Sequence, residues 1–457
     1  MPSTLPAGQP APEDGSLPAE ALKDVGKRPF GFYVHVPFCA VRCGYCDFNT
    51  YTASELGDAP GASRATYAEA AIAEIRLARK VIGDRDVAVD TVFFGGGTPT
   101  LLPPEDLVAV LGAIRAEFGL AADAEITTES NPDSVAAADL AALRDGGLNR
   151  VSIGMQSAVP SVLRALDRTH DPECVPQVVA WAREAGFEEV SLDLIYGSPG
   201  ESLDQWRRSL EAALQLCPDH VSAYALVVEQ GTALARSISR GDLAQPDDDD
   251  LADKYELADG LLADAGYGWY EVSNWARSER AWCRHNVGYW RGADWWGAGP
   301  GAHSHLAGVR WWNVKHPTAY ADRINTGRDP AAAREVLDDE TRRVERVMLE
   351  TRLVSGLPLD LLDDVGRAAV GELVSAGLIT LSAGATVATA AADAVVTTTS
   401  AADVKTTASL ADVKTTNAAG HVGTATSAAG HPVPGSVLVL TRRGRLLADA
   451  VVRALLP

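Results

Sequence analysis

Short β-rich runs alternate with amphipathic helical patterns through the first half of this chain, and this alternation restricts the fold more than any other feature. Strands are expected at residues 31–36, 90–94, 125–129, 150–153, 189–195 and 220–226. Helices are expected between them, at residues 67–82, 104–118, 135–143, 175–185 and 203–216. Successive β-then-α units favour parallel strands joined by right-handed crossovers. The sequence therefore predicts an α/β protein with a partial (βα)6 barrel, whose chemistry lies at the carboxyl ends of the strands.

The sequence predicts four parts in all. Residues 1–29, rich in Pro, Gly, Ala and acids, are expected to be a disordered leader, and residues 30–245 to form the barrel. Residues 246–330 are an aromatic-rich extension. Residues 331–457 show helices followed by a β-hairpin, which predicts a small winged-helix-like α+β module. A low-complexity insertion at residues 383–435 has few charges and no aromatic side chains, so it can bury little surface and is expected to interrupt that hairpin without a catalytic role.

Composition restricts the partners and the compartment. The chain of 457 residues has 61 acidic and 40 basic side chains, a net charge of −21, which repels nucleic acid phosphates. Six cysteines without a paired framework indicate a reducing compartment. The leader has no signal-peptide pattern, and no apolar run approaches the roughly 18 residues of a membrane span. We therefore expect a cytoplasmic protein that is neither nucleic-acid-binding nor integral to a membrane.

A cysteine triplet near the amino terminus carries the strongest chemical signal. Cys39, Cys43 and Cys46 form a C-x3-C-x2-C pattern, and three thiolates can hold three irons of a cubane cluster. The fourth iron is then open, and S-adenosylmethionine (SAM) can chelate it through its amino and carboxylate groups. The alternative is a structural zinc site, which normally takes four ligands, usually in two pairs. The remaining cysteines are scattered along the chain: Cys174, Cys217 and Cys283.

Polar and Gly-rich motifs follow the expected strands. Residues 95–100, Gly-Gly-Gly-Thr-Pro-Thr, come directly after the second strand, and glycines let the backbone approach a ligand closely. Polar side chains follow later strands: Glu129, Gln156, Arg168 and Asp193. Each of them alone is typical of a solvated or salt-bridged surface residue. Together they are expected to converge on one pocket, because parallel strands end at the same edge of a sheet.

In this order the motifs resemble the oxygen-independent coproporphyrinogen III oxidase group of the radical-SAM superfamily. They read Tyr33-x-His35-x-Pro37-Phe38-Cys39, Gly-Gly-Gly-Thr-Pro-Thr, Glu129-Ser-Asn-Pro, Gly154-x-Gln156-Ser157 and Asp193-Leu-Ile-Tyr-Gly-x-Pro199-Gly200. The resemblance implies that Cys39, Cys43 and Cys46 bind a [4Fe–4S] cluster. It places seven residues at SAM-contacting positions: Gly96, Gly97, Thr98, Glu129, Gln156, Arg168 and Asp193. Tyr33 and Tyr45 would flank the cofactor and the cluster.

Two features divide this group of proteins. True oxidases that resemble this chain have a further cysteine two residues after the third ligand, where this chain has Phe48. The H-N-x-x-Y-W motif at residues 285–290 marks the haem-chaperone branch. The resemblance therefore implies a protein that binds a cluster, SAM and haem, and passes haem to an acceptor protein, without coproporphyrinogen oxidase activity. It allows a homodimer and leaves open whether SAM is turned over. The alternative is oxidative decarboxylation of coproporphyrinogen III.

His285, which opens this motif, is the candidate haem ligand, since imidazole is a standard axial ligand of haem iron. Its surroundings in the sequence are aromatic: Trp269, Tyr270, Trp275, Trp282, Tyr289, Trp290, Trp295 and Trp296. Aromatic clusters, however, usually indicate core packing, and a histidine at a turn often belongs to a capped hydrogen-bond network. His303 and His305 are alternative ligands, and Cys283 is a further candidate that is expected to be a buried, inert thiol.

Overall fold

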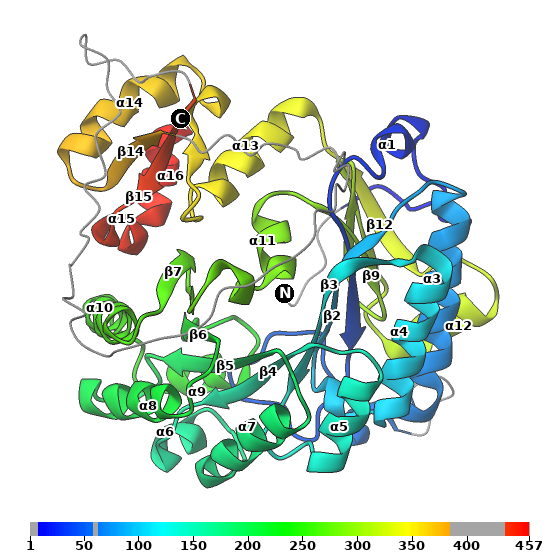
Figure 1. The fold of residues 1–457 in the computed structure, drawn as a ribbon, viewed down its shortest axis with the longest axis horizontal. Coiled ribbons are helices and arrows are strands. Elements are labelled where there is room, and N and C mark those ends of the chain that lie inside the picture. Colours follow the sequence, from blue (N-terminus) through cyan, green and yellow to red (C-terminus); the bar gives the residue numbers. More distant parts are fainter. Residues whose placement is uncertain (1–7, 58–62, 384–434, 457) are drawn as a thin grey trace, which may run out of the picture. The chain divides into compact units, whose positions relative to one another are not determined.

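The computed structural model describes residues 8–57, 63–383 and 435–456 (Figure 1). Six parallel strands form its centre and pair in the order of the chain. They are β1 (Phe30–Val36), β2 (Val89–Gly96), β3 (Leu120–Ser130), β4 (Arg150–Gln156), β5 (Glu189–Tyr196) and β6 (His220–Ala225). Every residue of β4 is buried, as expected for a strand covered on both faces. The prediction of an α/β fold with a partial parallel barrel is confirmed.

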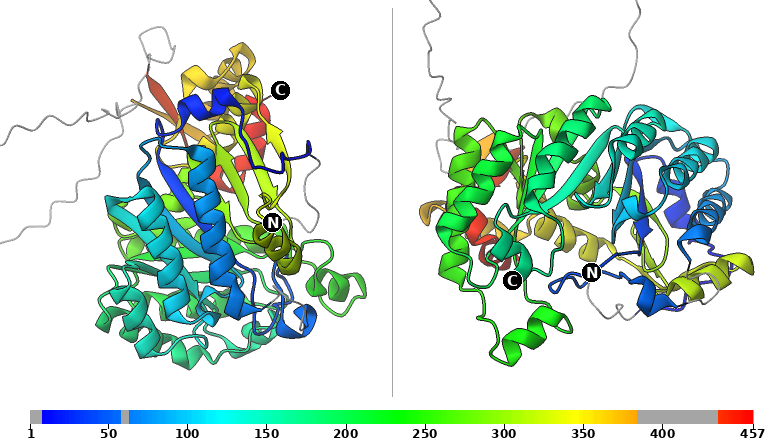
Figure 2. Two further views of the ribbon diagram at one scale, coloured as in Figure 1. Left: turned by 90° about the vertical axis from the view of Figure 1, so that its right-hand side faces the viewer. Right: turned by 90° about the horizontal axis from the view of Figure 1, so that it is seen from below.

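Helices connect these strands and lie along the outer side of the curved sheet (Figures 1 and 2). They are α3 (Tyr67–Ile82), α4 (Pro104–Phe118), α5 (Ala137–Asp145), α6 (Pro160–Ala165), α7 (Val175–Glu184) and α8 (Leu203–Gln215). Local sequence sets their starts. Pro104 at the first position of α4 has no backbone N–H to leave unpaired. Ser202 and Gln205 form a reciprocal capping box at the start of α8, with bonds of 3.2 and 2.9 Å.

Residues 268–336, most of them in the aromatic-rich extension, add strands to both edges of this sheet. At one edge β9 (Asp294–Ala298) pairs parallel with β1, followed by the antiparallel strands β10 (His303–Leu306), β11 (Val309–Asn313) and β12 (Ala331–Val336). At the other edge β6 pairs with β8 (Asn274–Ala276), and β8 with β7 (Gly268–Glu271). Among the described residues the result is one twelve-stranded sheet. The α-helices between β6 and β12 are α9 (Ala233–Ser239), α10 (Asp248–Asp264), α11 (Arg284–Trp290) and α12 (Pro317–Asn325).

The described part of the leader is ordered, which differs from the disordered leader expected at residues 1–29. Residues 19–24 form helix α1 (Ala19–Asp24). Gln9 exchanges two backbone hydrogen bonds of 2.8 Å with Arg334 of β12. These bonds satisfy backbone groups on an edge strand, so the leader gains a partner that its own composition does not reveal.

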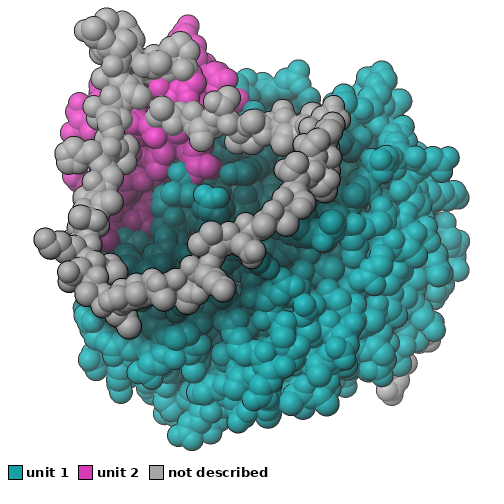
Figure 3. All heavy atoms as spheres, in the orientation of Figure 1, with its two compact units in different colours: residues 1–354 teal, residues 355–457 magenta. Residues whose placement is uncertain are grey.

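The chain divides into two compact units, Met1–Val354 and Ser355–Pro457 (Figure 3). Residues 331–354, expected at the start of the carboxyl-terminal module, lie in the first unit. They do so because β12 completes the hydrogen bonding of β11 and leads into α13 (Asp339–Glu350). The short helix α2 (Ala53–Leu56) also belongs to this unit.

In its described residues the second unit combines three α-helices with a three-stranded antiparallel sheet of order β13-β15-β14. Its elements are β13 (Leu357–Pro358), α14 (Asp364–Ser375), β14 (Ile379–Ala383), β15 (Ser436–Leu440), α15 (Arg442–Leu446) and α16 (Ala448–Leu455). β14 and β15 form the expected hairpin. The expected insertion at residues 383–435 lies outside the described residues except for its two ends. In the residues that the structure describes, no helix combines the length and the apolar character needed to cross a bilayer.

A buried carboxylate joins α3 to the loop after β9. Glu74 of α3 is fully buried and accepts hydrogen bonds from the Gly299 backbone N–H and the Asn313 side-chain amide, both at 2.8 Å, and from the Tyr320 hydroxyl. The same loop is held to the segment after the cysteine triplet, since the Asn49 amide donates to the Pro300 carbonyl at 3.0 Å. Burial raises the pKa of Glu74 from 4.5 to about 7, against the lowering effect of its donors.

Stability should therefore fall with rising pH through Glu74. Because its folded-state pKa lies above its ordinary value, the folded protein keeps a proton that the unfolded chain releases between pH 4.5 and about 7. We expect the free energy of unfolding of the wild type to drop by about 3 kcal/mol across this interval relative to that of Glu74→Gln, which does not titrate. Urea unfolding of both proteins at a series of pH values measures the difference. Parallel pH curves would contradict the assignment.

Candidate functional site

A cavity of about 420 Å³ opens at the carboxyl ends of β2 to β6, beside the loop that contains the cysteine triplet. Eleven of the residues singled out from the sequence line it: Cys39, Cys43, Tyr45, Cys46, Gly96, Gly97, Thr98, Glu129, Gln156, Arg168 and Asp193. The strand-end residues expected to converge on one pocket do so. Parallel pairing brings them together, because it places the ends of successive strands at one edge of the sheet.

The Gly-rich turn after β2 lies directly against the residues that precede Cys39. The Gly97 N–H donates to the Val36 carbonyl and the Thr98 N–H to the Phe38 carbonyl, both at 2.8 Å. A Cβ on Gly97 would stand 2.5 Å from the Phe38 carbonyl oxygen and 3.0 Å from its nitrogen. The turn therefore needs glycine at position 97, since two backbone segments meet there without space for a side chain.

A chain of polar contacts runs from this turn to the cysteine loop. The Asn131 amide donates to Thr98 Oγ1 at 3.0 Å, and Asn131 Oδ1 accepts from Arg168 Nη2 at 2.7 Å. Arg168 Nη1 in turn donates to Cys43 Sγ at 3.6 Å. Asn131 thus connects two candidate cofactor-binding segments and aims the guanidinium at a thiol. Sequence reasoning did not single it out, although it stands in the Glu-Ser-Asn-Pro motif at the end of β3.

Two carboxyl groups lie in the cavity wall. Glu129 Oε2 accepts from the Gly96 N–H at 3.1 Å, and burial, together with the negative Asp193, raises the pKa of Glu129 to about 8. Both oxygens of Asp193 lie within 2.9 Å of the Ser152 hydroxyl, and burial raises the pKa of Asp193 despite this donor. These groups can accept hydrogen bonds from hydroxyl or ammonium groups of a ligand, and a bound cation would favour their charged forms.

The three thiols meet the requirements of a cluster better than those of zinc. The described residues that line the cavity include no fourth cysteine and no histidine, the side chains that complete the usual structural zinc sites built on three cysteines. No three His, Cys, Asp or Glu side chains of the described residues are spaced to share one metal ion. A cubane does not require such sharing, because each thiolate binds its own iron. Burial, with neighbouring Cys46 and Cys43, raises the pKa of Cys39 to about 11 without metal; bound iron would reverse this.

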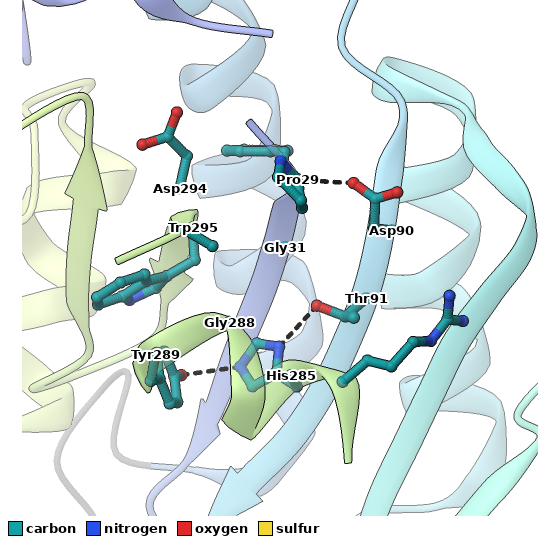
Figure 4. Close-up of a pocket in the computed structure, with 12 residues that line it drawn as sticks. Pro29, Gly31, Asp90, Thr91, His285, Gly288, Tyr289, Asp294 and Trp295 are labelled. Carbon is teal, nitrogen blue, oxygen red and sulfur yellow. Dashed lines mark hydrogen bonds between the residues drawn. The ribbon is translucent and has the colours of Figure 1, made fainter. Parts of the chain in front are cut away.

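His285 lies outside this cavity, in a closed hydrogen-bond network (Figure 4). Its ring nitrogens pair with the Thr91 hydroxyl and the Tyr289 hydroxyl, both at 2.8 Å. The ring stacks on Phe93 with centroids 5.2 Å apart, and burial lowers the pKa of His285 to about 3. The neighbouring pocket holds only about 30 Å³. Both nitrogens are thus engaged, so ligation of haem iron would require one of these bonds to break.

A carboxylate missed by sequence reasoning holds this motif in place. Glu125 of β3 accepts from the backbone N–H groups of Arg284 and His285 at 2.9 and 3.0 Å, where α11 begins. It thereby supplies the acceptor that the start of a helix requires. Cys283 is buried with its sulfur 3.7 Å from Glu125 Oε1, and burial raises its pKa, in agreement with the expected inert thiol.

The remaining candidates also lie apart from the cavity. Tyr33 of β1 donates its hydroxyl to His35 Nδ1 at 2.9 Å, and its ring stands 6.3 Å from that of His285. His305 has both ring nitrogens bonded, to the Ala293 carbonyl at 2.9 Å and the Gly308 N–H at 3.2 Å. His303 pairs with the Gly301 carbonyl at 3.2 Å. None of these three residues lines the cavity.

Comparisons with known proteins agree with this arrangement. The family described as the Radical SAM superfamily matches residues 33–213, the stretch that supplies the thiols and the carboxyl ends of β1 to β5. Among solved structures, coproporphyrinogen III oxidase (HemN) from Escherichia coli, described as a radical SAM enzyme, aligns over 95% of this chain and 92% of its own with a TM-score of 0.72. Their sequence identity is 22%, so this likeness shows a shared fold.

Two curated relatives identify the family within this superfamily. "Heme chaperone HemW" of Mycobacterium tuberculosis is 50% identical over 429 residues, which cover 94% of this chain and 95% of that protein. "Heme chaperone HemW" of Escherichia coli is 34% identical over 77% of this chain and 92% of its own length. The chain belongs to the HemW family of radical SAM proteins.

Proposed function

We propose that this chain is a haem chaperone that binds a [4Fe–4S] cluster, SAM and haem, and passes haem to an acceptor protein. The names of the two relatives support the haem and acceptor parts of this proposal. The observation that carries it is Phe48, an exposed phenyl ring in the wall of the cluster cavity, where oxidases that resemble this chain have a cysteine. We propose the cytoplasm as its compartment, and nucleic acid is not proposed as a partner of so acidic a chain.

The cavity residues supply the roles that this function needs. Cys39, Cys43 and Cys46 would each bind one iron, and Arg168 would donate a hydrogen bond to a coordinated sulfur. A cubane with one iron free of protein offers a binding position for the amino and carboxylate groups of SAM and can pass an electron. The remaining lining groups would bind and orient SAM: the backbone of Gly96 and Gly97, and the side chains of Thr98, Glu129, Gln156 and Asp193. Tyr45 would flank the cluster. Tyr33 would influence the site only indirectly, through its hydrogen bond to His35. His285 would hold α11 against β2 through its hydrogen bond with Thr91.

Paired measurements on one protein preparation test this function. After anaerobic cluster reconstitution, haem is titrated and followed by absorbance, and coproporphyrinogen III is supplied with SAM and a reductant in a parallel reaction. We expect saturable haem binding and no consumption of coproporphyrinogen III. The cluster-free protein serves as the control for the dependence of haem binding on the cluster. Turnover of coproporphyrinogen III would establish the oxidase alternative instead.

A further inference from the structure

Exposed apolar side chains gather at the mouth of the cluster cavity. Ten large apolar side chains stand out as exposed in the part of the chain that the structure describes, and four of them line this one cavity. They are Val41, Phe48, Tyr224 and Val227, which we call the apolar collar; their exposed fractions are 49%, 51%, 42% and 61%. Exposed apolar surface concentrated around a cavity is typical of a ligand-binding site, whereas scattered single residues are not.

The collar comes from two separate segments. Val41 and Phe48 belong to the loop of the cysteine triplet, and Tyr224 and Val227 to the end of β6 and the residue stretch after it. The Tyr224 hydroxyl accepts a hydrogen bond from the Asn274 amide at 3.4 Å. An extended flat ligand at the cavity mouth could therefore contact apolar groups from both segments at once.

Charged groups that line the same cavity influence the orientation of such a ligand. Four carboxyl groups line the cavity, those of Asp47, Glu129, Asp193 and Glu229, against the single guanidinium of Arg168. Carboxylates in this lining repel the carboxylates of a ligand and attract positive charge, although Glu129, whose pKa burial raises to about 8, adds little negative charge at neutral pH. A ferric porphyrin has a cationic metal centre, an apolar macrocycle and two propionates at one edge. Its apolar macrocycle suits the collar at the cavity mouth, while its propionates would point to solvent, away from these carboxyl groups.

We propose that the apolar collar is the binding site of the haem macrocycle, held by face contacts with Phe48 and Val227 rather than by ligation to His285. This inference rests on the proposed haem-chaperone function. Phe48 offers a ring for stacking, which adds to the burial of apolar area. The pocket beside His285, at about 30 Å³, has no space for a macrocycle. Binding through apolar contacts without a strong axial ligand also lets a carrier release its cargo to an acceptor that provides such ligands.

Matched substitutions test the site. Haem is titrated into cluster-loaded wild type, Phe48→Ser, Val227→Ser and Val336→Ser, and the dissociation constant is read from absorbance. Val336 of β12 is an exposed valine like Val227, but it lies outside the cavity. It is therefore the matched control for Val227. We expect binding to weaken about tenfold for Phe48→Ser and about threefold for Val227→Ser, and to stay unchanged for Val336→Ser. Iron–sulfur absorbance of each variant shows that the cluster is retained.

Two further arms separate face contacts from iron ligation. Iron-free protoporphyrin IX should compete with haem for the wild type, since the macrocycle carries the binding, and His285→Ala should bind haem within about twofold of the wild type. Failure of protoporphyrin IX to compete, or loss of haem binding in His285→Ala alone, would refute the assignment of the apolar collar as the haem-binding site. Unchanged binding in both collar variants would also overturn it and leave the chaperone function standing. Absence of haem binding by the wild type would instead refute the proposed function itself.

Discussion

Replacement of Cys43 by alanine is expected to abolish the iron–sulfur absorbance of the anaerobically reconstituted protein. A cubane held by three thiolates has no spare protein ligand, so two cysteines cannot retain it. Cys43 is the thiol that the Arg168 guanidinium contacts, at 3.6 Å. We expect bound iron and sulfide to fall by more than about tenfold, while the far-ultraviolet circular dichroism of the cluster-free variant matches that of the cluster-free wild type.

Cys174→Ala provides the control for this experiment. Cys174 is a free, half-buried thiol that precedes α7 and does not line the cavity. It should load iron and sulfide to the wild-type level. Full cluster absorbance in Cys43→Ala, or an equal loss in both variants, would refute the assignment of the triplet as the cluster ligands.

Gly97→Ala should disturb the site through the backbone alone. The added methyl group would stand 2.5 Å from the Phe38 carbonyl oxygen, and 2.9 and 3.0 Å from two further Phe38 backbone atoms. Backbone atoms cannot rotate away as a flexible side chain can, so either the Gly-rich turn or the segment before Cys39 must move. We expect the free energy of unfolding to fall by about 3 kcal/mol and cluster loading to fall with it. Urea unfolding of the cluster-free protein measures the first effect, and iron content the second.

The matched control for this prediction is Gly112→Ala. Gly112 lies within α4, and a Cβ there would meet nothing within 4 Å. Alanine is the stronger helix former, so this variant should gain about 0.5–1 kcal/mol and load its cluster normally. A Gly97→Ala protein as stable as the wild type would show that the turn can yield and that glycine is not required there.

Local structure is what the sequence predicts most accurately. The observed bounds of α3 and α4 equal those expected, and those of β1, β4 and β5 differ from expectation by a few residues. The reason is that the 3.6-residue period of a helix and the β-branched runs of a strand are patterns of neighbouring residues. The parallel order of β1 to β6 follows from the crossovers between them, since each helix must return the chain to the same edge of the sheet.

The sequence predicted which residues line the candidate site better than it predicted the hydrogen bonds between them. Thr98 and Arg168 are far apart in the sequence, and only their common contact with Asn131 shows that they act as one unit. His285 is the opposite case: its motif indicated haem, whereas the fold places both ring nitrogens in hydrogen bonds. Neighbours across strands decide such contacts, and no spacing along the chain encodes them.

The sequence by itself therefore determined the parallel α/β centre, the thiol triplet and the set of strand-end residues, because period, spacing and motif order are properties of neighbouring positions. Only the tertiary structure placed β9 against β1, joined β12 to the first unit, and brought Val41 and Phe48 to one cavity mouth with Tyr224 and Val227. Those outcomes depend on hydrogen-bond pairing and apolar contact between distant segments, whose free energies exist only once the chain has folded.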